Sequence, residues 1–164
     1  MFEKLFWIII IAAILGTGLI AGVFYGFSTF IMKALGRIPA NEGIAAMQSI
    51  NITVINPLFL GVFIGTGVVC AMLAVLSLVN WQGSTSVLVI ASAALYLFGC
   101  LGVTMVLNVP LNDELAAMNA ADAKSVALWT RYLSDWTFWN SVRTAASFAS
   151  SALLTVALVY LQTE

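Results

Sequence analysis

Long apolar stretches dominate the chain, and short polar segments separate them. Four stretches reach or exceed the roughly 20 residues that a helix needs to cross a bilayer. They span residues 5–32, 52–79, 87–107 and 137–161, and the first three contain no charged residue. The pattern predicts an all-α fold: one integral membrane four-helix bundle over residues 1–164. The first stretch is too long for the core of a signal peptide, so we expect it to remain in the mature protein.

The connections between these stretches differ in length and character. "NWQGSTS" is a short polar turn, which makes the second and third helices antiparallel neighbours. In the long segment "KALGRIPANEGIAAMQSIN", Pro39 and a capping Asn41 predict the start of a short amphipathic helix. In the other long segment, "NVPLNDELAAMNAADAKSVALWTRYLSDW", Pro110 is expected to break the third helix before another short helix begins. Short amphipathic helices are therefore expected in both long loops.

Composition and charge refine this picture. The chain is 62% hydrophobic and 8% charged, with a mean hydropathy of +1.07, whereas soluble domains carry about 25% charged residues. Lys33, Arg37, Lys124 and Arg131 lie in the two long loops, and Lys4 alone stands on the opposite side. The positive-inside rule then places the long loops in the cytoplasm and both termini outside, in a bacterial inner membrane. A net charge of −1 gives no reason to expect nucleic acid, so membrane lipid is the expected surroundings.

Residues that bind metals or cofactors are scarce. The chain has no histidine, and its two cysteines, Cys70 and Cys100, lie far apart inside apolar runs. Such thiols more often behave as small buried hydrophobes than as a disulfide or a metal site. We therefore predict no metal site and no haem or other cofactor.

Glycines recur at four-residue spacing in two of the apolar stretches. Gly18, Gly22 and Gly26 follow this spacing in the first stretch, and Gly61 and Gly65 follow it in the second. Small residues at this spacing let helix backbones approach closely in a membrane. They indicate either a contact within the bundle or an interface with a second copy in a homo-oligomer.

A polar and aromatic stripe runs into the fourth stretch through "WTFWNSVR". Steps of three and four residues place its members on one helix face: Trp129, Tyr132, Trp136, Trp139, Asn140, Arg143 and Ser147. Insertion scales assign about 2.5 to 3.5 kcal/mol to an arginine at the centre of a membrane helix. Arg143 therefore either reaches outward to lipid phosphate, with the tryptophans as an interfacial belt, or has polar partners inside.

Candidate partners occur at the same end of the other helices. Asn56 stands at the start of the second helix, and Thr104, Asn108 and Asn112 recur at spacing four where the third helix ends. Ser28 and Thr29 lie at the corresponding end of the first helix. All these groups are expected near one face of the membrane. The sequence thus predicts a polar, aromatic-walled cavity that opens toward the long-loop side, with Arg143 as its one deep charge.

These residues also carry a resemblance to a known family. "AGVFYGFSTFIMKALG", "EGIAAMQSIN" with "NP", "GVTMVLNVPLN" and "W..Y...WTFWNSVR" resemble the anthrone-oxygenase-like family of small four-helix membrane proteins, over roughly residues 5–161. Characterised relatives in fungal polyketide pathways oxidise anthrones to anthraquinones with molecular oxygen. The resemblance implies an oxygenase of an aromatic or quinol-like substrate that needs no cofactor.

The spacing argument gives the candidate residues their roles in such a reaction. Arg143 and Asn140 are the predicted catalytic residues, because they would stabilise a substrate oxyanion in a dry cavity. Two further sets would bind substrate: the aromatic Trp136, Trp139 and Tyr132 by stacking on a flat ring system, and the amides of Asn56, Asn108 and Asn112 by holding its oxygens. The general base stays unassigned. Asp135 is the best-placed carboxylate, but it equally fits an ion pair with Arg131 four residues earlier.

A non-enzymatic hypothesis stands beside this one. The chain would then be an accessory subunit, or a lipid- or quinone-binding module, in a larger membrane complex, and its polar stripe would fix helix packing. A channel or transporter is disfavoured, because the sequence has no internal repeat and no ring of acidic residues in the spans. An enzyme predicts a cavity lined by Arg143 and asparagines, whereas a packing role predicts an Arg143 fully occupied by neighbouring groups.

Overall fold

The computed structural model describes residues 2–120, 122 and 125–163, and within them the chain is helical without a strand. The all-α fold predicted from the sequence is confirmed. The elements in chain order are α1 (Phe2–Gly26), η1 (Phe27–Ile31), α2 (Met32–Leu35), α3 (Ala40–Thr53), α4 (Pro57–Val79), α5 (Gly83–Ala94), η2 (Leu95–Gly102), η3 (Thr104–Asn108), α6 (Val109–Ala116) and α7 (Ser125–Thr163), where η denotes a π-helical segment.

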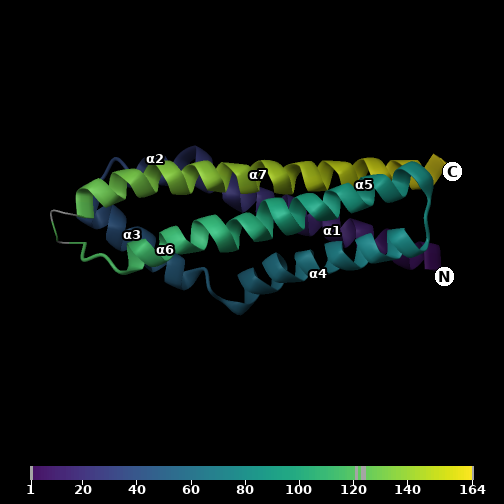
Figure 1. The fold of residues 1–164 in the computed structure, drawn as a ribbon, viewed down its shortest axis with the longest axis horizontal. Coiled ribbons are helices and arrows are strands. Elements are labelled where there is room, and N and C mark those ends of the chain that lie inside the picture. Colours follow the sequence, from purple (N-terminus) through teal and green to yellow (C-terminus); the bar gives the residue numbers. More distant parts are fainter. Residues whose placement is uncertain (1, 121, 123–124, 164) are drawn as a thin grey trace.

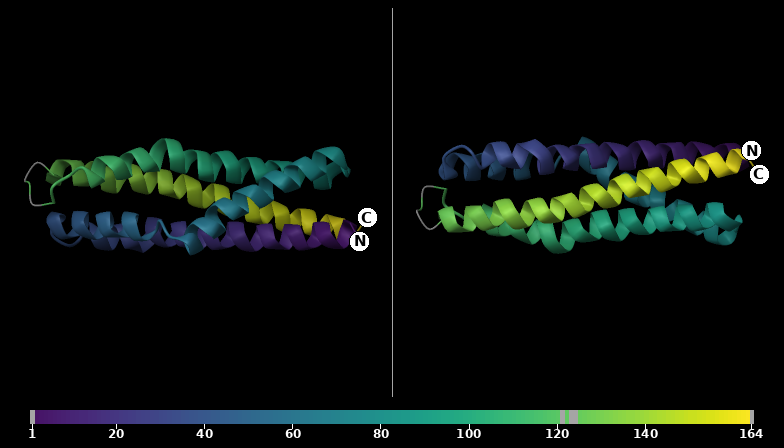
Figure 2. Two further views of the ribbon diagram at one scale, coloured as in Figure 1. Left: turned by 90° about the horizontal axis from the view of Figure 1, so that it is seen from below. Right: turned by 90° about the horizontal axis from the view of Figure 1, so that it is seen from above.

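Four helical rods, long and apolar enough to cross a membrane, lie side by side (Figure 1). They cover Leu5–Leu35, Pro57–Val79, Gly83–Ala116 and Ser125–Leu161. Helix α7 lies between the first and third rods, and α4 passes diagonally from the side of α1 to the side of α5 (Figure 2). Helix α3 is the short helix predicted in the first long loop, and it packs against the loop-side end of α7.

The third rod continues past its predicted end. Pro110 does not end the helix, because α6 continues directly from η3 and carries the proline in its first turn. A proline ring normally clashes with the carbonyl one turn earlier. The wider π-helical turn that precedes it relieves this clash, so the rod bends and continues to Ala116.

The second rod begins later than the apolar pattern indicates. Ile52 and Thr53 complete α3, and the chain turns before α4 starts at Pro57. The side-chain carbonyl of Asn56 accepts hydrogen bonds from the amides of Leu58 and Phe59, at 3.1 and 3.0 Å. Asn56 therefore caps α4, and this cap, rather than hydrophobicity, sets where the helix begins.

The close helix contacts occur at other glycines than the regularly spaced ones. A methyl group on Gly16 would lie 2.2 Å from the hydroxyl of Thr66, and one on Gly67 would lie 2.5 Å from Leu101. By contrast, Gly22, Gly61 and Gly65 face open space in the single chain. Among the regularly spaced glycines, Gly18 does approach another helix: a methyl group on it would lie 3.5 Å from the hydroxyl of Ser151.

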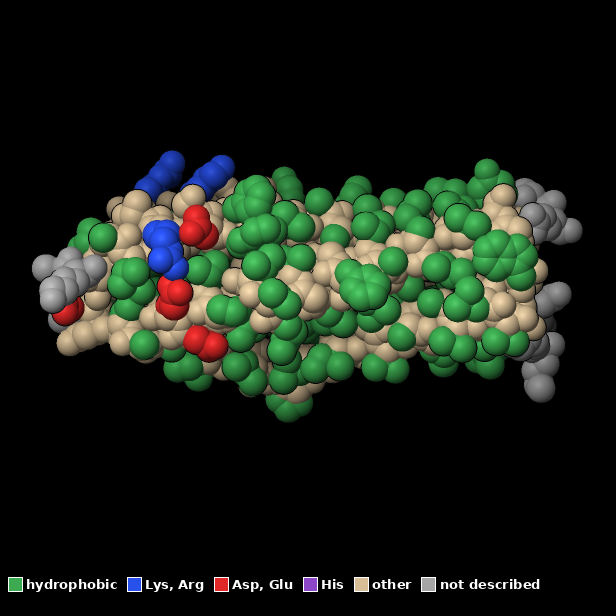
Figure 3. Space-filling view, viewed as in Figure 1, with side chains coloured by type: hydrophobic (Ala, Val, Ile, Leu, Met, Phe, Trp, Pro, Cys, Tyr) green, Lys and Arg blue, Asp and Glu red, His purple; other side chains and the backbone are tan. Residues whose placement is uncertain are grey.

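Charged side chains gather at the end of the molecule that carries α2, α3 and α6, as the visible face in Figure 3 shows. Hydrophobic side chains are spread over the rest of that face. Large apolar side chains on the rods are exposed, such as Leu15, Val68 and Phe148. An apolar surface of this extent is suited to lipid and not to water. Of the basic residues that predicted the orientation, Lys124 lies outside the described residues.

Candidate functional site

The polar stripe of α7 faces the interior of the bundle. Tyr132, Trp136, Asn140, Arg143 and Ser147 are each 5% exposed or less, and Trp129 is similarly buried. The helix therefore turns its polar face inward and its apolar face outward, the reverse of a helix in water. Burial of Arg143 to 4% also means that its charged group does not reach outward to lipid phosphate.

The guanidinium of Arg143 has few partners for a buried charge. It donates to the side-chain oxygen of Asn140 at 2.7 Å and to the hydroxyl of Thr104 at 3.1 Å. Its central carbon lies 4.1 Å from the ring centre of Phe24 and 5.2 Å from that of Trp136, within reach of cation–π attraction. Its Nε atom is buried without a hydrogen-bond partner. Among the described residues no carboxylate pairs with Arg143, so its charge lacks a counter-ion.

Asn140 connects α7 to α1 and orients the arginine. Its amide nitrogen donates to the backbone carbonyl of Phe24 at 2.7 Å and to the hydroxyl of Ser28 at 2.6 Å. With both amide hydrogens donated to α1 and η1, its carbonyl oxygen must point toward Arg143. Asn140 thus fixes the position of the guanidinium.

Asn108 and Asn112 bind α7 from the third rod in different ways. Asn108 is 1% exposed and donates to the backbone carbonyl of Trp136 at 3.2 Å, while its own side-chain oxygen is buried without a partner. The side-chain oxygen of Asn112 accepts two hydrogen bonds, from the hydroxyl of Tyr132 and from the indole nitrogen of Trp136, both at 2.8 Å. Its amide nitrogen therefore remains as the group able to donate to a ligand.

A cavity of about 490 Å³ adjoins this network, and we call it the Arg143 cavity. Its polar wall consists of Arg143, Thr104, Asn112 and Asn51. Its other walls are apolar and aromatic; they include Phe24, Phe27, Phe59, Phe63, Met47, Leu101 and Trp136. An apolar volume of this size with a few converging donors is typical of a small-molecule site.

The structure separates the predicted site residues into two groups. Arg143, Trp136 and Asn112 line the Arg143 cavity, and Asn140 and Asn108 are hydrogen-bonded to residues of its wall. The other predicted residues do not line it: Asn56 caps α4, Trp139 packs edge-on against Phe138, and Tyr132 has its ring stacked between Trp129 and Trp136. Both faces of Tyr132 are thus covered by protein.

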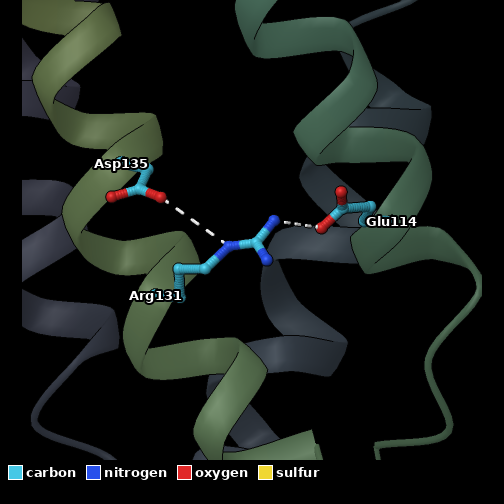
Figure 4. A network of polar contacts seen from close by, with 3 residues as sticks. All are labelled: Glu114, Arg131 and Asp135. Carbon is cyan, nitrogen blue, oxygen red and sulfur yellow. Dashed lines mark hydrogen bonds and ion pairs between the residues drawn. The ribbon is translucent and has the colours of Figure 1, made fainter.

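Two carboxylates near this end of the bundle, those of Glu114 and Asp135, form ion pairs on the surface (Figure 4). Arg131 lies between them, 2.6 Å from Glu114 and 3.7 Å from Asp135, and all three side chains are about half exposed. Asp135 therefore pairs with Arg131, as the four-residue spacing between them allowed. Neither carboxylate lines the Arg143 cavity.

Sequence reasoning missed the aromatic wall that α1 and α4 contribute. Phe24 stands four residues before Ser28, which had been placed at this end, so helical spacing could have identified it. Phe59 and Phe63 stack on each other with ring centres 5.7 Å apart. They follow the cap at Asn56 by one and two turns. This spacing places both rings on one face of α4 near the loop-side end, but it can be used only when the start of α4 is known.

Comparison with known proteins assigns the family. Searches of curated proteins and of solved structures gave no match. The family model for anthrone oxygenase matches residues 59–153, which is more than half of the chain and includes the α7 residues from Ser125 to Arg143. A chain with four apolar rods, a buried polar stripe and this match is an integral membrane protein that belongs to the anthrone oxygenase family.

Proposed function

We propose that this protein oxidises a flat aromatic substrate of the anthrone or quinol type with molecular oxygen, and that the substrate binds in the Arg143 cavity. The observation that carries the proposal is the buried guanidinium of Arg143, which lacks a counter-ion among the described residues and adjoins an apolar, aromatic-walled volume. A buried charge of this kind is costly unless a ligand of opposite charge or a strong acceptor completes it.

Arg143 would act on the substrate through electrostatics. An anthrone that loses a benzylic proton becomes an anion whose charge is delocalised onto its oxygen. A guanidinium held in place by Asn140 and Thr104 stabilises that oxyanion far better in an apolar cavity than in water. It therefore makes the substrate easier to ionise. The group that accepts this proton stays unassigned, because no described carboxylate lines the cavity and the chain has no histidine.

The anion then supplies the electrons that reduce oxygen. It transfers an electron to dioxygen, and the two radicals combine to form a C–O bond, giving a peroxide at the benzylic carbon. Loss of the remaining hydrogen on that carbon and cleavage of the O–O bond release water and leave a ketone. One substrate and one dioxygen thus yield one quinone and one water, with no outside reductant.

The other cavity residues would hold the ring system. Phe59 and Phe63 from α4 and Trp136 from α7 offer aromatic surfaces, and the amide nitrogen of Asn112 would offer a second donor for a substrate oxygen. A substrate with two oxygen functions fits these two donors, which stand on different rods.

Oxygen uptake with anthrone as substrate tests the proposal. Wild type and Arg143→Gln are compared in lipid nanodiscs, with protein-free nanodiscs to subtract spontaneous oxidation. Loss of an oxyanion donor lowers rates by about 10²- to 10³-fold in enzymes, so we expect a decrease of that order. The matched control is Arg131→Gln, which removes an exposed arginine that pairs with Glu114 and should leave the rate unchanged. Equal rates for wild type and Arg143→Gln would refute the proposal.

A second candidate function is a non-catalytic accessory subunit, or a lipid- or quinone-binding module, of a larger membrane complex. The partial occupation of Arg143 by Asn140, Thr104 and Phe24 favours it, because these contacts also hold three rods together. Gentle purification followed by native mass spectrometry separates the two hypotheses. A stable partner protein without oxygen uptake supports the accessory role, and a retained aromatic molecule that Arg143→Gln loses supports the enzyme.

The proposed setting is a bacterial inner membrane with the long loops in the cytoplasm. Lys33, Arg37 and Arg131 support it, because all three lie at the loop-side end. A reporter fused after Glu164 should read as external. A cytoplasmic reading would invert the orientation but leave the Arg143 cavity at the loop-side end.

A further inference from the structure

We propose that the Arg143 cavity opens sideways into the lipid, between the first half of α4 and the π-helical part of the third rod, so that its ligand enters from the bilayer and not from water. The occupant is a flat apolar molecule with an acidic or carbonyl oxygen, dissolved in the membrane. This inference concerns access and goes beyond the proposed oxidation.

The path from the long loops is closed by packed side chains. Ile44, Met47 and Leu115 are each 1% exposed or less, and they form one cluster with Trp129, Tyr132 and Trp136. The hydrogen bonds from Tyr132 and Trp136 to Asn112 tie α7 to α6 across this cluster. The sequence predicts an opening in this direction, whereas this packed cluster supports the sideways route.

The opposite end is closed as well. The fully buried Tyr96 donates from its hydroxyl to the backbone carbonyl of Phe63 at 3.0 Å, which ties the third rod to α4. One turn further along α4, Gly67 packs closely against the side chain of Leu101: a methyl group on this glycine would lie 2.5 Å from it. These contacts end the cavity toward the termini.

The remaining direction is the flank of the bundle. Three lining residues are exposed there: Ile55 by 70%, Ile64 by 53% and Met105 by 65%. Ile55 and Ile64 lie at the turn before α4 and on its first half, and Met105 lies on η3. Figure 1 shows α4 diverging from the third rod toward the end that carries α3 and α6. A rim of exposed apolar residues at membrane depth faces hydrocarbon, and such a rim admits apolar molecules while it excludes ions.

Chemical labelling of a cavity residue tests this route without any turnover. Cys70 and Cys100 are replaced by alanine, and Thr104→Cys places a thiol beside Arg143, whose charge favours the reactive thiolate. Proteoliposomes then receive either pyrene maleimide, which dissolves in lipid, or a sulfonated maleimide, which stays in water. We expect labelling by the pyrene reagent to be at least about tenfold faster, because the sulfonate is costly to bring into hydrocarbon.

Bulk at the rim is the second arm of the test. Ile64→Trp and Met105→Trp, each added singly to the labelling variant, should slow the pyrene reagent severalfold. The matched control is Met72→Trp, also on α4 and exposed by 41% but away from the cavity. All variants are first required to elute as single species.

Three results would overturn the inference. The sulfonated reagent would react as fast as the pyrene reagent if the ligand came from water. Unchanged pyrene labelling with tryptophan at the rim would place access elsewhere, and no labelling by either reagent would mean a sealed cavity. Because labelling requires no oxidation, a failure here is separate from a failure in the oxygen-uptake assay.

Discussion

The two ends of the bundle are built differently, although both are helical and apolar. Toward the termini, residues such as Ile10, Leu73 and Leu154 are 1% exposed or less and form one continuous core. Its polar groups are hydroxyls and carry no charge: Ser92 donates to the carbonyl of Ser150 and Thr17 to the carbonyl one turn earlier, while the hydroxyls of Ser77 and Thr85 have no hydrogen-bond partner among the described residues. Toward the long loops, the helices contain π-helical turns, a charged group without a counter-ion and a cavity.

This difference supports the proposal that the terminal end stabilises the fold and that the loop-side end binds the ligand. Buried polar groups that form hydrogen bonds stabilise the folded state, whereas buried polar groups without partners destabilise it. The cost is greatest for a buried charge such as Arg143, which has no counter-ion among the described residues, and a bound anion would offset it. The terminal end should therefore carry more of the stability, and the loop-side end should carry the chemistry.

The largest expected effect is on stability and contrasts two leucines of α4. Leu73→Ala removes a fully buried side chain from the terminal core and should cost about 2 to 5 kcal/mol of unfolding free energy. Leu60→Ala should cost clearly less, because Leu60 already borders the Arg143 cavity. Unfolding midpoints in the same detergent measure both. Equal losses would mean that the two ends are packed alike.

The next effect comes from giving Arg143 a counter-ion. Asn140→Asp places a carboxylate where the side-chain oxygen now accepts from the guanidinium at 2.7 Å. Binding of an anionic aromatic probe should weaken by about tenfold, equivalent to 1.4 kcal/mol, because the protein would neutralise its own charge. Thermal stability should fall less than with Asn140→Ala, because the buried arginine gains a counter-ion while the donation to the carbonyl of Phe24 is lost in both variants.

The matched variant for this test is Asn140→Ala, which removes the hydrogen bonds without adding charge. It should lower both stability and probe binding. Fluorescence titration with anthracene-2-carboxylate and thermal melts in detergent measure the two quantities. Tighter probe binding by Asn140→Asp would contradict the view that Arg143 awaits an anion.

The smallest expected effect concerns the indole of Trp136. Trp136→Phe keeps an aromatic wall but removes the donor to Asn112, leaving Tyr132 as the group that orients this amide. A loss of about 0.5 to 1.5 kcal/mol in probe binding follows from one neutral hydrogen bond. Trp139→Phe is the control, because Trp139 lies outside the cavity wall. Equal effects of the two variants would remove Asn112 from the proposed site.

Most of the fold could be predicted from the sequence. Charge-free apolar stretches identify membrane helices because the cost of burying charge in lipid is large and local. Helix ends were predicted less well, since the cap at Asn56 and the π-helical turns before Pro110 depend on hydrogen bonds that hydrophobicity does not encode. Glycine spacing was also a weak guide, because the tight contacts at Gly16 and Gly67 depend on how the rods cross.

The sequence by itself determined the all-helical membrane fold and the inward stripe of α7, because apolar length and helical period act within one segment. The tertiary structure decided which stripe residues share a cavity. Trp136 and Arg143 line it, while Tyr132 is enclosed by two tryptophans and Asn56 is used as a cap. Divergence of α4 from the third rod creates the space, and this depends on contacts between residues far apart in the chain, such as Tyr96 with Phe63 and Gly67 with Leu101.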